Sequence, residues 1–179
     1  TSNEHKSREA ERILSEFRIS LEHLPGKGTE IQADDLSSIA LFAAKEASRR
    51  YHKPVIVEDA GLFIDELNGF PGPYSSYVHR TLGLEKFLQL LTSLRSRSAV
   101  LRSSVSYCAP NGGPLVFEGV SKGSIGSRAS GTYGFGFDPV FKPEGYESTF
   151  AEMTLEQKNR LSHRGDSLRK FARWFLQNE

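Results

Sequence analysis

Residues 55–61 have the sequence Val55-Ile56-Val57-Glu58-Asp59-Ala60-Gly61, an apolar triplet followed directly by two carboxylates. Pro54 stops any preceding helix, and the triplet predicts a short buried strand. Glu58 and Asp59 then stand where the strand ends, which is the place at which α/β folds hold their ligands. Carboxylate oxygens suit a hard cation such as Mg²⁺, and a carboxylate can accept a proton from an attacking water. Taken alone, the pair fits a solvated turn slightly better than a site.

Strand and helix patterns alternate outward from this segment and predict one α/β domain over residues 1–179. Alternating apolar residues predict strands over 99–109 and 115–125, joined by a hairpin turn at Pro110-Asn111-Gly112-Gly113. Apolar residues with helical spacing predict helices after Thr1-Ser2-Asn3, over 35–51, over 84–94 and around 168–175.

Two shorter elements are also predicted. Ile19 and Leu21 alternate with polar residues, which indicates a short strand. Thr154 and Gln157 have the spacing of a capping box, which predicts the start of a short helix.

Composition limits the class of protein. The chain has 179 residues, a net charge of +1 and one cysteine, Cys108. Near-neutral charge gives no global attraction to nucleic acid or to a membrane surface. No apolar run approaches the ~20 residues that cross a bilayer, and no signal-peptide pattern opens the chain. A single cysteine excludes an intrachain disulfide and fits a reducing compartment. We therefore expect a cytoplasmic protein that binds neither a membrane nor nucleic acid.

The first predicted helix offers a phosphate site. Thr1, Ser2 and Asn3 are all good N-cap residues, and a helix N-terminus presents unpaired N–H groups with partial positive charge. Lys6, one turn further on, can reach a phosphate oxygen. An ordinary cap followed by a surface lysine explains the same residues, and from this segment alone that simpler explanation is favoured.

Glycines and aromatic residues alternate over residues 130–139, Ser-Gly-Thr-Tyr-Gly-Phe-Gly-Phe-Asp-Pro. Closely spaced glycines let the backbone approach a ligand, and Phe135 or Phe137 can stack on a base. Asp138 can accept hydrogen bonds. A glycine-rich turn with core aromatics is a strong alternative. The glycines do not form a dinucleotide fingerprint, because Pro139 stands where its third glycine belongs.

A third cluster is cationic. Lys158, His163 and Arg164 lie between two predicted helices, and such groups can hydrogen-bond the edge of a purine or a phosphate. A positively charged helix C-terminus that ends at Gly165 is about equally consistent with the sequence.

The order of the motifs is more informative than any one of them. Along the chain come Thr-Ser-Asn-x-x-Lys (1–6), Glu-Ile-Gln (30–32), Val-Glu-Asp-Ala-Gly-Leu (57–62), Gly-Phe-Pro-Gly-Pro-Tyr-Ser (69–75), Gly-Phe-Gly-Phe-Asp-Pro (134–139), Thr-Phe-Ala-Glu-Met-Thr (149–154), Glu-Gln-Lys-Asn (156–159) and Ser-His-Arg-Gly (162–165). This series resembles the inosine triphosphate pyrophosphatase family, whose members hydrolyse ITP, dITP and XTP to a monophosphate and pyrophosphate. The resemblance covers essentially the whole chain, and the segments around Glu30 and 74–77 are closer to archaeal members.

The resemblance implies a two-lobed α/β domain around a long mixed β-sheet with flanking helices, and an active site in the cleft between the lobes. It also implies a homodimer, Mg²⁺ as cofactor and a purine nucleoside triphosphate as substrate. By position, it assigns triphosphate binding to Thr1, Ser2, Asn3 and Lys6. It assigns Mg²⁺ to Glu30 and Asp59, with Asp59 as general base and Glu58 assisting. Base binding is assigned to Phe135, Gly136, Phe137, Asp138, Lys158, His163 and Arg164.

The chain departs from the family pattern in two places. Ala60 stands where the family usually has a serine against the substrate, so one hydroxyl contact is lost. Family members also have a short strand before the Thr-Ser-Asn motif, so we expect residues upstream of Thr1. Two rival functions remain: a pyrophosphatase for other modified nucleotides, such as modified pyrimidine triphosphates, and a non-catalytic nucleotide-binding or RNA-binding module.

Overall fold

The computed structural model describes residues 3–24, 28–29 and 31–178. Its helices are α1 (Glu4–Ser15), α2 (Leu36–Tyr51), α3 (Ser75–Leu90), α4 (Leu155–Leu161) and α5 (His163–Asn178). Its strands are β1 (Val55–Ile64), β2 (Pro71–Gly72), β3 (Ser98–Cys108), β4 (Leu115–Ile125) and β5 (Phe141–Pro143). Short 3₁₀ turns, η1 (Asp65–Leu67) and η2 (Phe150–Glu152), complete these elements.

The strands form one sheet in the order β2-β1-β3-β4-β5. Every strand pair in the described part of the chain is antiparallel, so the expected mixed sheet is wrong on this point. The reason lies in the connections. Helix α3 returns the chain to the end of β1 at which Ile64 pairs with Ala99, and a tight hairpin joins β3 to β4.

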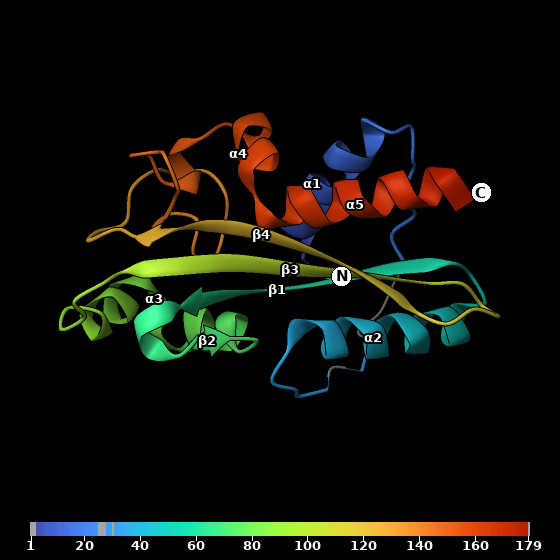
Figure 1. The fold of residues 1–179 in the computed structure, drawn as a ribbon, viewed down its shortest axis with the longest axis horizontal. Coiled ribbons are helices and arrows are strands. Elements are labelled where there is room, and N and C mark those ends of the chain that lie inside the picture. The colour runs from blue at the N-terminus through green and yellow to red at the C-terminus, as the bar shows by residue number, and fades with distance from the viewer. Residues whose placement is uncertain (1–2, 25–27, 30, 179) are drawn as a thin grey trace.

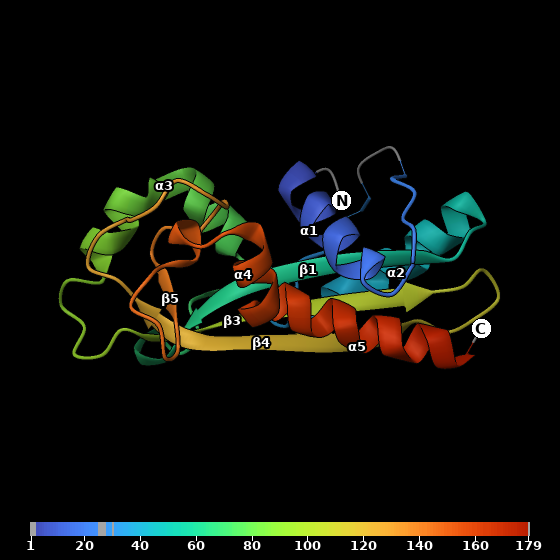
Figure 2. The ribbon, with the colours of Figure 1, turned by 90° about the horizontal axis from the view of Figure 1, so that it is seen from above.

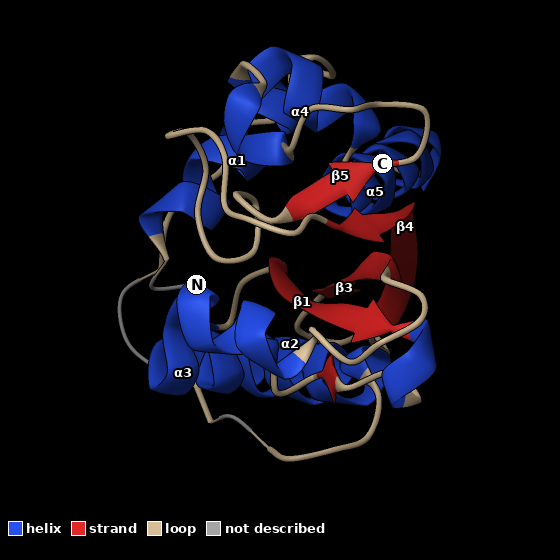
Figure 3. Ribbon diagram, turned by 90° about the vertical axis from the view of Figure 1, so that its left-hand side faces the viewer, coloured by secondary structure: helices blue, strands red, loops and turns tan. Residues whose placement is uncertain are grey.

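Helices cover both faces of the sheet. Figure 1 and the end-on view in Figure 3 show α1, α4 and α5 on one face, and α2 and α3 on the other. Figure 2 shows α3 and β5 toward one end of the long strands, and α1 with much of α5 toward the other. The molecule is therefore a sheet between two helical layers, with different helices over its two ends.

The hydrophobic core is divided in the same way. One cluster lies around Leu62, Leu101 and Phe87, at the end covered by α3. A second cluster lies around Val105, Ile13 and Phe171, under α1 and α5, and a small third cluster lies beneath α2. Because β1 and β3 contribute to both large clusters, the strands run continuously from one to the other. This agrees with the expected two-lobed arrangement and leaves the middle of the strands for polar side chains.

Local capping signals fix several helix starts where the sequence predicts them. The Asn3 side chain accepts hydrogen bonds from the backbone N–H groups of His5 and Lys6, at 3.0 and 3.2 Å. Thr154 and Gln157 form the predicted capping box before α4. The predicted helix over 35–51 and the hairpin strands are confirmed within one residue at each end.

Other boundaries differ from the prediction. Helix α3 begins at Ser75, nine residues before the predicted Leu84, and contains a break at Gly83, where φ is 70°. The buried hydroxyl of Ser75 receives the Leu62 N–H and donates to the Gly72 carbonyl, which ties this start to β1. The expected strand at Ile19 and Leu21 is wrong, because residues 19–24 have no strand partner in the described chain.

Strand β1 continues through the predicted turn. Gly61 lies inside it, and a Cβ atom there would stand 2.3 Å from the Gly72 carbonyl oxygen. The glycine therefore permits the close approach of β2 and does not end the strand. None of the helices in the described ranges is both long enough and apolar enough to cross a membrane.

The first turn of α5 lies directly on β4 at Gly119. A Cβ atom on Gly119 would come within 2.0 Å of the His163 carbonyl oxygen and 2.4 Å of the Ser167 nitrogen. The next residue of β4, Val120, donates its backbone N–H to the Asp166 carboxylate at 3.3 Å. This contact sets the distance between α5 and the sheet.

Gly119→Ala is expected to lower the free energy of unfolding by about 1–3 kcal/mol, because the added methyl group forces α5 away from β4. Urea denaturation measures this change. Gly113→Ala is the matched control, since nothing lies within 4 Å of the position its Cβ would take. Equal urea midpoints for the two variants would contradict the packing argument.

Candidate active site

A belt of buried and half-buried charged side chains lies between the two large core clusters. It joins α1, β1, the segment before β5, α4 and the start of α5. Its members are Lys6, Glu9, Glu58, Asp138, Lys158 and Arg164. Buried charges require paired partners, so the belt holds these five segments in one arrangement.

Glu58 lies at the centre of the belt. Its carboxylate contacts Lys6 Nζ at 2.8 Å and Arg164 Nη2 at 3.0 Å, and it accepts a hydrogen bond from the Ser103 hydroxyl at 2.9 Å. Burial alone would raise the pKa of Glu58, but the positive charges of Arg164 and Lys6 outweigh it and hold the pKa far below its ordinary value. Glu58 is therefore ionised at neutral pH, and its oxygens are committed to cations.

Glu9 is the residue that the sequence analysis missed. Lys158 Nζ donates to Glu9 Oε1 at 2.6 Å, and Arg164 Nη1 donates to Glu9 Oε2. Burial would raise the pKa of Glu9, but Arg164 and Lys158 overcome this and lower it. A signal was present: Glu9 follows Lys6 by three residues and precedes the core residue Ile13 by four, so it shares the inward face of α1.

Asp138 completes the cage around Lys158. Its Oδ2 atom receives hydrogen bonds from Lys158 Nζ at 2.5 Å and from the Phe135 N–H at 2.7 Å. Burial raises the pKa of Asp138, and the Lys158 ammonium offsets only part of this effect. Gly134 has a φ of 75°, and a Cβ atom there would stand 2.2 Å from Asp138 Oδ2, so only glycine allows the loop to wrap this carboxylate.

The two predicted stacking residues have different environments. Phe137 is 7% exposed and packs in the core, with its ring centroid 4.8 Å from that of Phe87 and 5.5 Å from that of His79. Phe135 is partly exposed, and its ring lies 4.8 Å from Lys158 Nζ and 5.4 Å from Arg164 Cζ. Of the two rings, Phe135 is the one that a ligand can reach.

His163 is buried beside the belt. Desolvation and the neighbouring Arg164 charge lower its pKa well below the ordinary value, so its imidazole is neutral. Its Nδ1 atom has no hydrogen-bond partner among the described residues. A buried polar atom without a partner is costly, and a ligand atom would relieve that cost.

Asp59 lies on the opposite face of the sheet from Glu58. Side chains alternate along a strand, and Asp59 pairs across β1 and β3 with Ser104, whose hydroxyl lies 3.2 Å from that of Ser37 in α2. The Asp59 carboxylate is partly buried and receives the Ala60 N–H at 3.0 Å. Glu58 and Asp59 therefore lie in different environments, on opposite faces of the sheet, and do not act as one carboxylate pair.

Not every predicted residue can be placed. Thr1, Ser2 and Glu30 lie outside the described residues. Within the described ranges, no group of three or more histidine, cysteine, aspartate or glutamate side chains is arranged to hold a metal ion. Asp59 is thus the described member of the predicted metal pair, and Asn3 and Lys6 are the described members of the predicted phosphate site.

Comparison with known proteins fits this geometry. A family model described as the Ham1 family matches residues 1–174. The chain belongs to the Ham1 family. Proteins named dITP/XTP pyrophosphatase from Methanothermobacter marburgensis and Pyrococcus horikoshii are 48% and 44% identical to it over 178 residues, which is 99% of this chain and 95% of each relative.

Solved structures of Ham1 proteins have the same fold. The Staphylococcus aureus protein matches with a TM-score of 0.84 at 26% identity, over 100% of this chain and 97% of that one. The Coxiella burnetii protein matches with a TM-score of 0.81 at 26% identity, over 99% and 96%. The family model and the two dITP/XTP pyrophosphatase relatives confirm the resemblance drawn from the ordered motifs. They also confirm its archaeal character, since the M. marburgensis and P. horikoshii relatives are archaeal.

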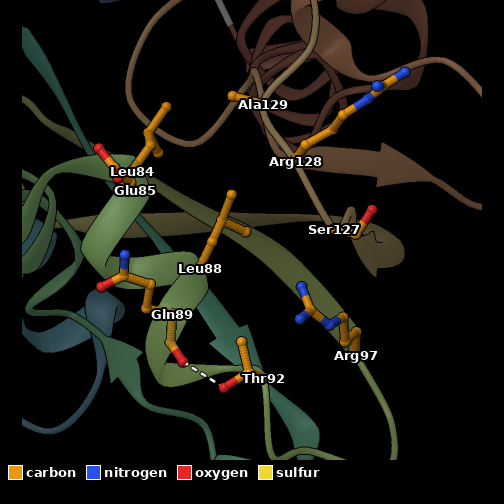
Figure 4. A pocket seen from close by; sticks show the side chains of 9 residues that line it. All are labelled: Leu84, Glu85, Leu88, Gln89, Thr92, Arg97, Ser127, Arg128 and Ala129. Carbon is orange, nitrogen blue, oxygen red and sulfur yellow. Dashed lines mark hydrogen bonds between the residues drawn. The ribbon is translucent and has the colours of Figure 1, made fainter.

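A separate pocket of about 540 Å³ lies between α3 and residues 127–129 of this Ham1 protein (Figure 4). Its lining is largely apolar around Leu84 and Leu88, with Arg97 and Arg128 at its margin. None of the predicted site residues is among its lining residues. The charged belt, and not this pocket, is therefore the candidate active site.

Glu9→Gln is expected to lower the free energy of unfolding by about 3–5 kcal/mol at neutral pH, because it leaves Lys158 and Arg164 short of a buried counter-charge. Thermal or urea denaturation measures this loss. Glu11→Gln is the matched control, since Glu11 is exposed on the same helix. A Glu9→Gln variant as stable as Glu11→Gln would refute the proposed role of Glu9.

The pH dependence has a definite sign. Folding lowers the pKa values of both Glu9 and Glu58 from the ordinary 4.5. Their contribution to stability is therefore complete above about pH 4.5 and is lost as the pH falls from there toward the folded-state values. The Glu9→Gln variant lacks its share of this contribution, so its stability should fall less steeply in acid than that of the wild type.

Proposed function

We propose that this protein hydrolyses non-canonical purine nucleoside triphosphates, namely ITP, dITP and XTP, to the monophosphate and pyrophosphate. The names of its archaeal relatives support this reaction. The observation that carries it is the charged belt, in which the phosphate-side Lys6 and the base-side Lys158 and Arg164 are linked through Glu58 and Glu9.

The phosphate end of the substrate would meet the start of α1. Asn3 caps this helix, and the partial positive charge of the helix N-terminus favours negative charge there. Lys6 adds a full positive charge that Glu58 holds in place at 2.8 Å. We assign the neutralisation of the departing pyrophosphate to this helix end and Lys6, with Glu58 as the residue that positions Lys6.

The base end would lie at Phe135, with Lys158, Arg164 and His163 beneath it. Lysine and arginine are pure donors, and the 6-oxo group of hypoxanthine or xanthine is an acceptor. Adenine presents an amino donor at that position, which would face these cations without offering an acceptor, at a cost of about 1–3 kcal/mol. This arrangement supports selection of 6-oxo purines over adenine.

We propose Mg²⁺ as the cofactor, held by Asp59 together with Glu30. Asp59 fits this role because its carboxylate is partly exposed, while the oxygens of Glu58 are committed to cations. Residues 55–61 of β1 pair only with β3 in the described chain, so a phosphate chain at this open edge of the sheet can meet Lys6 on one face and Asp59 on the other. A bound Mg²⁺ would neutralise charge on the phosphate oxygens during the reaction. Asp59 would also orient the attacking water and accept its proton. Ala60 supplies no hydroxyl to the substrate, so Asp59 and the backbone must position it.

Two rival functions make different predictions. A pyrophosphatase for modified pyrimidine nucleotides would prefer dUTP or a related substrate over ITP. A non-catalytic nucleotide-binding or RNA-binding module would release no pyrophosphate from any of them. The ion pair of Lys6 with Glu58 and the neighbouring carboxylate of Asp59 together favour catalysis.

Asp59→Asn is expected to reduce pyrophosphate release from ITP by at least about 100-fold, because an amide cannot accept the proton of the attacking water. The assay compares ITP, XTP, dITP, ATP, GTP and dUTP, with Mg²⁺ and with a chelator. Asp65→Asn, at an exposed position just after β1, is the control and should keep full activity. Normal turnover by Asp59→Asn would rule out Asp59 as the base, and equal rates on ITP and dUTP would rule out the purine preference.

We also propose that the protein works as a homodimer in the cytoplasm, where nucleotides destined for polymerases are found. The resemblance to inosine triphosphate pyrophosphatases supports the dimer. Size-exclusion chromatography with light scattering should give twice the mass of one chain at micromolar concentration. A mass equal to one chain would reject the dimer without affecting the proposed reaction.

A further inference from the structure

His5 stacks on the ring of the proposed base-binding residue. The two ring centroids lie 5.2 Å apart, and the ring planes are inclined by only 19°. His5 is an exposed residue in the first turn of α1, and Phe135 lies 130 positions further along the chain. The contact is therefore a tertiary one that joins the phosphate end of the site to its base end.

The charged and aromatic side chains around Phe135 differ in their exposure to solvent. Lys158 and Arg164, which lie 4.8 and 5.4 Å from its centroid, are almost completely buried. The imidazole of His5 is exposed and makes no side-chain hydrogen bond with the rest of the described chain. Its position is instead set by its backbone, because the His5 N–H donates to Asn3 at 3.0 Å.

We propose that the purine base inserts between His5 and Phe135, so that His5 forms the second stacking wall of the base site. This inference rests on the proposed function. A nucleotide whose phosphates meet Asn3 and Lys6, and whose base reaches Lys158 and Arg164, must pass the side chain of His5, which stands on the same helical turn. An aromatic ring at that point offers a second π-face to the base.

Insertion requires the rings to separate by the thickness of a base, and His5 forms the side of the slot that can move. The Phe135 backbone is held in place, because its N–H donates to Asp138 at 2.7 Å and its carbonyl oxygen accepts the Asp138 N–H at 3.1 Å. The His5 side chain is exposed and can change rotamer without disturbing the core. The stacked pair is thus a closed slot that opens by a rotamer change of His5.

Stacking is tolerant of base identity, because every purine has a π-face. Loss of the His5 ring should therefore weaken the binding of all purine nucleotides and raise KM more than it lowers kcat. It should leave the binding of a polyphosphate without a base unchanged. An imidazole that merely fills an empty slot would behave in the opposite way, since its removal would strengthen nucleotide binding.

The test measures the binding of IMP and of inorganic tripolyphosphate by calorimetry, together with kcat and KM for ITP, in the full chain. His5→Ala is expected to weaken IMP binding by about 10-fold, the effect of one lost stacking contact. His5→Phe should restore IMP binding to within about 3-fold of the wild type, and neither variant should change tripolyphosphate binding. Arg8→Ala, an exposed change on the same helix, is the matched control and should bind IMP as the wild type does.

The proposal is overturned if His5→Ala binds IMP as tightly as the wild type or more tightly, or if His5→Phe is no better than His5→Ala. Equal urea midpoints for the variants show that the changes do not arise from unfolding. If the wild type releases no pyrophosphate from ITP, the proposed function fails and this inference fails with it. If it does release pyrophosphate and only the His5 variants behave unexpectedly, the inference fails alone.

Discussion

The pairing of Glu9 with both Lys158 and Arg164 is the constraint on which the rest of the site depends. Three cations and three carboxylates share the space between the two large cores: Lys6, Lys158 and Arg164 against Glu9, Glu58 and Asp138. Such charges cannot be removed from water singly, because an uncompensated buried ion costs several kcal/mol. The group is therefore stable only when α1, β1, α4 and α5 are all in place. The site is assembled only when these four elements have folded together.

The same network supports the proposed selection of a base by its polar edge. Its donors are not flexible surface groups waiting for a ligand. Lys158 is held by Glu9 and Asp138, and Arg164 by Glu9 and Glu58, so their positions are set before the substrate arrives. Pre-positioned donors discriminate well, because a base that offers no acceptor gains no hydrogen bond for entering between His5 and Phe135. The belt is rigid, and the exposed His5 is the side of the proposed base slot that can move.

Local chemistry decided which parts of this structure could be predicted from sequence. Asn3, the Thr154 and Gln157 capping box and the hairpin turn before Leu115 act over a few residues, and the elements that they start or connect lie where they were expected. The antiparallel direction of β1 against β3, the burial of Phe137 and the early start of α3 depend on contacts between distant segments, which no periodicity encodes. Glu9 was missed for a related reason: on an amphipathic helix a glutamate is normally a solvated residue, and only its partners about 150 positions away make it a buried one.

Helix α1 then has a role beyond packing. Residues 3 to 9 advance about 9 Å along the helix axis. Over that length the helix presents a capped N-terminus and Lys6 for phosphate, an imidazole stacked on Phe135, and a carboxylate that fixes both base-edge cations. One short rigid element therefore relates the phosphate end of the site to its base end. Since a helix cannot stretch, α1 fixes the distance between the proposed phosphate site and the base-edge cations, and a shift of the helix would move both together.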